Sequence, residues 1–181
     1  QRTVHCVSGN LHVSNCRFDA ISSRPDSLKC ITVIKAKQSE IRNSEFYTGP
    51  LNTALDIGMI PGTDLKIENN LIAAGSAIEI AFPSRSVPET ETKVRLACNT
   101  VSAVSGLLVL LSTQRERPPE SPVPVETQGN VWDVEFLVSL AVQPIKENQM
   151  RPEINQRVLE QMMLWQSVDT RFRIRQAYVG I

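Results

Sequence analysis

The chain has 181 residues and carries 19 basic and 19 acidic side chains, so its formal net charge is zero. This balance excludes a strong overall field that would attract nucleic acid or an acidic membrane. Aromatic residues make up only 5% of the chain, and no apolar run reaches the roughly 18 residues needed to cross a bilayer. We therefore predict no nucleic-acid partner and no membrane insertion. Because the chain begins with Gln1, we expect a fragment or a processed chain.

A repeat runs through residues 1–141. Five segments share a template of alternating apolar and polar residues, a small polar corner and a bulky apolar residue: 11–18, 39–46, 65–72, 94–101 and 125–132. Their last residues are separated by 28, 26, 29 and 31 positions. A second apolar strand follows in each copy, at Ile31/Val33, Leu55/Ile57, Ile78/Ile80, Leu107/Val109 and Val138/Leu140. This pattern predicts an all-β fold, a right-handed parallel β-helix of about five to six coils.

Stacking places equivalent positions of successive coils above one another. The corner position gives a column of small, mostly polar side chains: Cys16, Ser44, Asn70, Asn99 and Asn130. Amide side chains at strand spacing can hydrogen-bond along such a column and satisfy backbone groups of the turns. We therefore predict a structural ladder at the corner. An outward column carries both signs of charge and predicts a solvated face: His12, Glu40, Lys66, Arg95 and Glu126.

The second strand of the repeat holds the candidate catalytic residues. Asp56 and Glu79 each lie between two inward apolar residues, so on adjacent coils their carboxylates would face outward about 5 Å apart. Such a pair can supply an acid and a base, and retaining glycosidases use a similar separation. The column continues to Thr32 on one side and to the apolar Leu108 on the other, without an aligned His or Arg. We expect an exposed acidic pair without catalysis, and catalysis by Asp56 and Glu79 is the alternative.

Beyond Ala141 the period is lost, and residues 142–181 are predicted to form a capping segment of the same domain: a loop, a helix and a terminal strand. The helix would begin at Pro152-Glu153, with apolar residues at i, i+4, i+8 and i+11: Ile154, Val158, Met162 and Trp165. An open β-helix end exposes unpaired strand edges and core side chains, which such a cap would cover. We expect its apolar side chains to pack near Trp132 and Val138.

The terminal strand is predicted from the alternation of Phe172 and Ile174 with three arginines, Arg171, Arg173 and Arg175. Three guanidinium groups on one side of a strand could bind an anion or an acidic polymer. A solvated basic face is the simpler interpretation.

Two pairs of runs resemble a known family. Ile67-Glu-Asn-Asn-Leu-Ile72 with Ser76-Ala-Ile-Glu-Ile80, and Cys98-Asn-Thr-Val101 with Ser105-Gly-Leu-Leu-Val109, resemble coils of the pectin-lyase-like right-handed parallel β-helix superfamily. The resemblance covers roughly residues 4–141 and implies a fold rather than a function, because enzymes and non-enzymes share this scaffold. The tail, with Leu164-Trp165-Gln166 and then Phe172 and Tyr178, resembles β-helix segments attached to bacterial serine/threonine protein kinases.

The function expected from these features is a non-catalytic binding or sensory module within a larger bacterial protein, such as a serine/threonine protein kinase. The alternative is a polysaccharide-active hydrolase or lyase that uses Asp56 and Glu79. The expected partner is a polysaccharide or another protein. No cofactor or metal is predicted, because the chain has only two histidines, His5 and His12, and no glycine-rich phosphate loop. The kinase-linked resemblance alone implies a location outside the cytoplasm.

Overall fold

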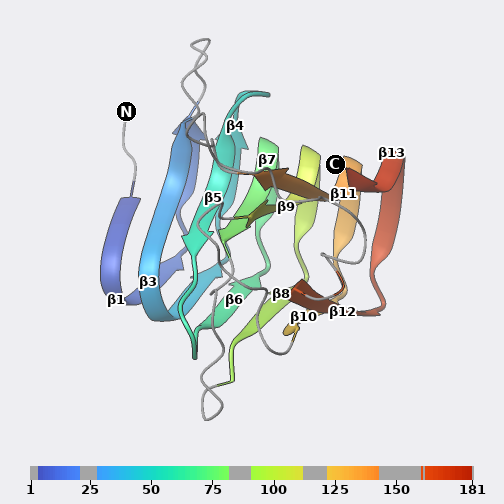
Figure 1. The fold of residues 1–181 in the computed structure, drawn as a ribbon. Coiled ribbons are helices and arrows are strands. Elements are labelled where there is room, and N and C mark those ends of the chain that lie inside the picture. The colour runs from blue at the N-terminus through green and yellow to red at the C-terminus, as the bar shows by residue number, and fades with distance from the viewer. Residues whose placement is uncertain are drawn as a thin grey trace, which may run out of the picture.

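The computed structural model of the chain describes residues 4–20, 28–81, 91–111, 122–142, 160 and 162–180. Within this part of the chain, thirteen strands join into one sheet that coils into a parallel β-solenoid (Figure 1). The strands are β1 (Val4–Ser14), β2 (Arg17–Ala20), β3 (Lys29–Arg42), β4 (Glu45–Thr48), β5 (Thr53–Gly58), β6 (Asp64–Glu68), β7 (Leu71–Ala81), β8 (Lys93–Ala97), β9 (Thr100–Leu111), β10 (Val123–Gln128), β11 (Val131–Val142), β12 (Met163–Val168) and β13 (Arg171–Gly180). The predicted all-β, parallel β-helix class is confirmed.

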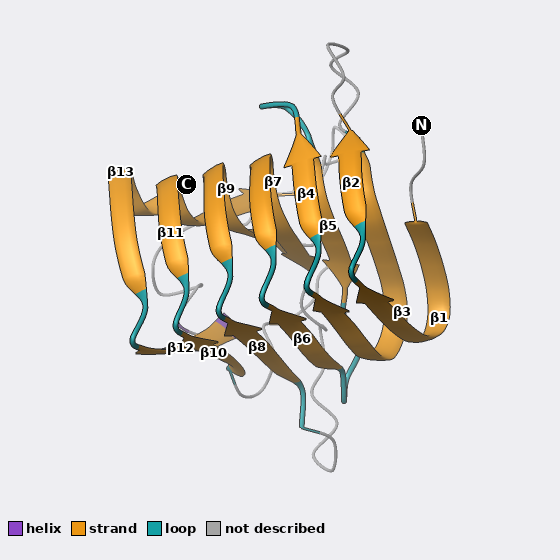
Figure 2. Cartoon of the chain, turned by 180° about the vertical axis from the view of Figure 1, so that it is seen from behind, coloured by secondary structure: helices purple, strands orange, loops and turns teal. Residues whose placement is uncertain are grey.

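The solenoid has three faces, each a stack of parallel strands. The first face contains residues 11–14 of β1 and 38–42 of β3, followed by β6, β8, β10 and β12. The second face contains β2, β4 and the first halves of β7, β9, β11 and β13 (Figure 2). The third face contains the first halves of β1 and β3, then β5 and the second halves of β7, β9, β11 and β13. Each long strand therefore serves two faces.

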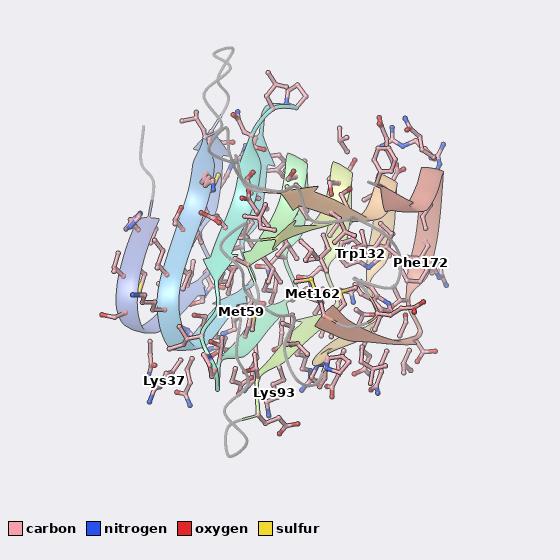
Figure 3. All side chains as sticks on the ribbon, in the orientation of Figure 1. Lys37, Met59, Lys93, Trp132, Met162 and Phe172 are labelled. Atoms are coloured by element: carbon pink, nitrogen blue, oxygen red, sulfur yellow. The ribbon has the colours of Figure 1, made fainter. Side chains whose placement is uncertain are left out.

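The core fills the space between the three faces. Six apolar residues of the repeat are at most 1% exposed: Ile67, Ile72, Ile78, Ile80, Leu96 and Val109. Figure 3 shows Met59, Met162 and Trp132 among the interior side chains, whereas Lys37 and Lys93 project from the lower edge. The rings of Phe18 and Phe46 stack in register, with centroids 4.9 Å apart. Alternation along each strand thus places the apolar residues inside, as the repeat predicts.

A tight corner joins the first face to the second in every coil. Its first residue has a positive φ: 55° at Asn15, 49° at Asn43, 53° at Asn69, 55° at Cys98, 63° at Gly129 and 50° at Asp169. Asparagine, aspartate and glycine tolerate this left-handed conformation better than other residues. The Asn-rich turn of the repeat therefore follows from the backbone geometry of the corner.

The second residue of the corner forms the predicted ladder. Asn70 Nδ2 donates to Asn99 Oδ1 at 3.0 Å, and Asn99 Nδ2 donates to Asn130 Oδ1 at 3.0 Å. The same oxygens accept the backbone N–H groups of Asn70 and Asn99 at 3.0 and 2.8 Å. Asn99 Nδ2 also donates to the carbonyl of Ile67 at 2.7 Å. The column continues through Ser44, whose N–H donates to Asn70 Oδ1 at 3.0 Å. The ladder is therefore structural, as predicted.

The C-terminal segment differs from the predicted helical cap. The start of the predicted helix, at Pro152-Glu153, falls within residues 143–159, which lie outside the described part. In the described part, helical conformation is limited to Glu160 and Met162, and Trp165, predicted on the helix, lies instead in strand β12. Here the alternation of Met163 and Trp165 prevails over the helical spacing, because β12 can pair in parallel with β10 along its whole length.

The terminal strands add a further coil. β12 continues the first face and β13 continues the second and third faces. Met162 and Met163 are each 7% exposed, and the rings of Trp165 and Trp132 have centroids 6.4 Å apart. Packing of this segment near Trp132 is therefore confirmed, but a coil of strands provides it. The predicted terminal strand with Phe172 and Ile174 is confirmed as β13. No helix in the described ranges is long and apolar enough to cross a membrane.

Candidate functional site

The two carboxylates singled out in the repeat are brought together on the third face. Asp56 of β5 and Glu79 of β7 are paired in the parallel register, and Thr32 and Leu108 continue the column on either side. Their neighbours Leu55 and Ile57 in β5, and Ile78 and Ile80 in β7, are in the core. The predicted adjacency of the two carboxylates is thus correct.

A lysine missing from the prediction lies against both carboxylates. Lys29 begins β3, and its Nζ lies 2.9 Å from Asp56 Oδ2 and 3.4 Å from Glu79 Oε1. Thr53 Oγ1 donates to the other oxygen of Glu79, Oε2, at 3.3 Å. We call Lys29, Thr53, Asp56 and Glu79 the Lys29 cluster. It brings together one ammonium, two carboxylates and one hydroxyl.

The Lys29 cluster is largely shielded from solvent. The side chains of Lys29, Asp56 and Glu79 are 30%, 18% and 11% exposed. Cys30 of β3 and Ala54 of β5, on the same face, are also buried. The expectation of an exposed acidic pair without a fixed partner is therefore wrong. Charges removed from water need a partner of opposite sign, and Lys29 is that partner.

The protonation of Lys29 follows from two opposing effects. Burial lowers the pKa of Lys29, whereas its hydrogen bond to Asp56 and the charges of Asp56 and Glu79 raise it. The carboxylates prevail, so the pKa of Lys29 lies above its ordinary value of 10.5. Lys29 is thus a fixed cation at neutral pH.

The repeat period could have indicated that Lys29 lies near the two carboxylates. Lys29 precedes Asp56 by 27 residues and Glu79 by 50, close to one and two repeat lengths. A basic side chain one repeat before an acidic one is expected to lie on the neighbouring coil. The signal is indirect because Lys29 is in register with Thr53, not with Asp56. Only the reach of its long side chain brings the ammonium to the carboxylates.

The three arginines lie on the outermost strand of the second face. Arg171, Arg173 and Arg175 are all exposed. Asp133 of the adjacent strand lies 3.9 Å from Arg173 Nη1 and 3.4 Å from Arg175 Nε. The predicted basic strand exists, but an internal carboxylate already neutralises part of its charge. An anion site at this strand stays a prediction.

A shallow depression of about 260 Å³ lies on the first face at its N-terminal end. It is lined by Asn10, Leu11, His12, Gln38, Ser39, Glu40, Asp64 and Lys66. His12 Nδ1 and Glu40 Oε2 are 3.0 Å apart, and Asn10 Nδ2 donates to Gln38 Oε1 at 3.4 Å. Ser39 Oγ and Asp64 Oδ1 are buried without a hydrogen-bond partner among the described residues. The side chains of Asn10, His12 and Gln38 are exposed, so the depression offers polar groups to a ligand.

No family model, curated protein or solved structure matches the chain. The β-solenoid fold therefore stands on the structure itself. The resemblances to the pectin-lyase-like superfamily and to kinase-linked segments stay predictions. The described residues contain no group of three or more His, Cys, Asp or Glu side chains that could hold a metal ion.

Proposed function

We propose that this chain is a non-catalytic β-solenoid module that binds a polysaccharide or another protein. The observation that carries this proposal is the contact of Lys29 with both Asp56 and Glu79. Acid–base catalysis needs one carboxyl group that holds a proton and one that does not. Asp56 Oδ2 and both carboxylate oxygens of Glu79 already contact Lys29 or Thr53 within the molecule, which leaves little of either carboxylate to act on a substrate. The Lys29 cluster therefore serves structure better than catalysis.

The depression on the first face supports the binding part of the proposal. Amide, imidazole, carboxylate and ammonium groups line it, and all can hydrogen-bond to sugar hydroxyls or to polar groups of a protein. All of the lining residues stand on β1, β3 and β6, which are paired strands of one stack. Groups held on strands bind without a large ordering cost.

The adjacency of Asp56 and Glu79 favours the second candidate, a polysaccharide hydrolase or lyase. An assay of the chain against acidic and neutral polysaccharides separates the two functions. We expect no cleavage by the parent chain, nor by the Asp56→Asn and Glu79→Gln variants. Cleavage by the parent that is lost in both variants would establish the enzyme and end the present proposal.

Binding can be tested at the depression with a matched pair of variants. Glu40 and Glu126 belong to the same outward column, but only Glu40 lines the depression. For a polysaccharide of the panel that binds in calorimetry, we expect Glu40→Gln to raise the Kd at least about tenfold. Glu126→Gln should leave it unchanged. Equal effects of both variants, or no binding by any polysaccharide, would contradict binding of a polysaccharide at the depression.

The wider setting of the module is proposed from the resemblance alone. On that basis it belongs to a larger bacterial protein, such as a serine/threonine protein kinase, and lies outside the cytoplasm. The full-length gene sequence tests this directly. Kinase motifs and a membrane span beside the solenoid are the expected result, and their absence would remove the kinase link without affecting the proposed binding.

A further inference from the structure

The middle of the second face carries no charge. Outward side chains of β7 and β9, together with Val131 of β11, form a patch that we call the central patch: Leu71, Ala73, Thr100, Ser102, Val104 and Val131. Three of these are large apolar residues that remain exposed: Leu71 at 38%, Val104 at 38% and Val131 at 44%. Figure 2 looks onto this face, where the strands lie side by side. Exposed apolar groups gathered on one flat surface mark an interaction site.

The two flanks of the central patch carry opposite net charge. Towards the N-terminus, β2 and β4 present Arg17, Asp19 and Glu45, one base and two acids, for a net charge of −1. Towards the C-terminus, β11 and β13 present two acids and three bases, for a net charge of +1: Asp133, Glu135, Arg171, Arg173 and Arg175. Within the described residues, no carboxylate forms an ion pair with Arg171, whereas Glu45 Oε2 lies 3.6 Å from Arg17 Nη1 on the exposed surface. An uncharged centre between polar flanks is the anatomy of a protein interface.

We propose that this face pairs with the same face of a second copy, about a two-fold axis that runs parallel to the strands over β9. This arrangement places β9 against β9, β7 against β11 and β4 against β13 of the other copy. Leu71 of each copy would then face Val131 of the other, and Glu45 would face Arg171. Thr100 would lie at the axis, opposite Thr100 of the second copy. Such an interface is self-complementary, as a two-fold dimer requires.

Charge selects this axis over the other face-to-face arrangement. A two-fold axis along the solenoid would place each flank against itself, with Arg171 opposite Arg171 and Glu45 opposite Glu45. Like charges placed opposite each other are costly, whereas complementary flanks fix the register. Aligned packing of two sheets about 10 Å apart lets the Leu71 and Val131 side chains interdigitate.

The size of the face predicts a weak, reversible dimer. The five strands that meet a counterpart, at about 4.8 Å spacing, and four residues at about 3.3 Å give a face of roughly 19 by 13 Å. This flat area, about 250 Å² per copy, is well below the roughly 800 Å² per partner of a standard interface. We expect a dissociation constant on the order of 100 μM to 1 mM. This inference does not depend on the proposed ligand at the first face, because it concerns a different surface.

Sedimentation equilibrium over about micromolar to millimolar concentration is the first test. The wild-type chain should shift from monomer to dimer and form no larger species. Thr100→Arg places two like charges at the axis and should keep the chain monomeric throughout. Gln128→Arg adds the same charge to the exposed first face and should dimerise like the wild type. Circular dichroism confirms that both variants are folded.

A charge swap tests the geometry itself. Glu45→Arg alone and Arg171→Glu alone should each raise the dissociation constant at least about tenfold. The double variant exchanges the two charges and should restore wild-type dimerisation. A wild-type chain that stays monomeric at every concentration would overturn the proposal, whatever other protein binds this face. Unimpaired dimerisation of Thr100→Arg, or failure of the double variant to recover, would overturn it equally.

Discussion

The corner ladder and the outward column of the first face arise from the same stacking but differ in burial. In the ladder, Asn99 and Asn130 are 2% and 0% exposed, and their side chains hydrogen-bond to each other and to the backbone. In the outward column, His12 and Glu40 also meet at 3.0 Å, but their side chains are 51% and 32% exposed. Stacking places equivalent side chains one above another in both columns, but only the ladder is shielded from water.

This difference teaches which repeated contacts stabilise the solenoid. An exposed ion pair gains little, typically about 0–1 kcal/mol, because water solvates the separated charges almost as well. A buried amide has no water to replace its partners, so each donor or acceptor left unpaired costs about 1–3 kcal/mol. The Lys29 cluster lies between these limits, since its side chains are partly shielded.

The largest effect is expected at the ladder. Asn99→Ala removes the oxygen that accepts two bonds from Asn70 and the amide that donates to the carbonyl of Ile67 and to Asn130. We expect the free energy of unfolding to fall by about 3 kcal/mol. Urea denaturation followed by circular dichroism measures this change.

The matched control for Asn99 is the exposed corner residue Asn69. Its side chain donates to Asn43 Oδ1 at 2.8 Å in an exposed position, and its φ of 53° suits glycine. Asn69→Gly should therefore change the free energy of unfolding by less than about 0.5 kcal/mol. Equal losses from the Asn99 and Asn69 variants would show that burial does not separate the two columns.

An intermediate effect is expected at the Lys29 cluster. Lys29→Met keeps an unbranched apolar stem but leaves Asp56 and Glu79 without their shared cation. The expected loss is about 1–2 kcal/mol at pH 7, smaller than for a fully buried pair because Lys29 is partly exposed. Lys66→Met is the control, since Lys66 is more exposed and lies 3.8 Å from its acidic partner Asp64. A smaller loss of unfolding free energy for Lys29→Met than for Lys66→Met would contradict the role of Lys29 as the shared partner of Asp56 and Glu79.

The pH dependence of the Lys29 cluster follows from the raised pKa of Lys29. A cation whose pKa is higher in the folded state contributes fully below its unfolded pKa, near 10.5, and loses that contribution as pH rises through the folded value. We expect the difference in unfolding free energy between wild type and Lys29→Met to stay constant from pH 8 to about pH 10 and to shrink above it. An increase of this free-energy difference above pH 10.5 would contradict a raised pKa of Lys29 in the folded state.

The smallest effect is expected in the outward column. Glu40 contacts His12 at 3.0 Å and Arg42 at 3.1 Å, both on the exposed surface. Glu40→Gln should change the free energy of unfolding by less than about 0.5 kcal/mol, although it should weaken ligand binding at the depression. A loss above about 2 kcal/mol would place Glu40 with the buried ladder and remove the contrast between the two columns.

The repeat predicted the register between neighbouring strands correctly because two periods agree with each other. Alternation along a strand and recurrence of the whole segment both place Ile67 and Leu96 in the core and Asn70 beside Asn99. The same reasoning did not detect the last coil. Phe172 lies 40 positions after Trp132 (172 minus 132), and this longer spacing hid a further copy of the template in residues 165–172. The apolar spacing of Met162 and Trp165 then favoured a helix.

From sequence alone, the period and the alternation determined the fold class, the core and the neighbours of each strand, because these depend on backbone pairing and on inward or outward direction. Tertiary structure decided how far each outward position is covered. Glu79 is 8% exposed and Leu71 is 38% exposed, although both lie on the outer side of β7. Burial depends on what packs over a face, and the contact of Lys29 with Glu79 depends on the reach of a side chain. Neither is encoded in the spacing of residues along one strand.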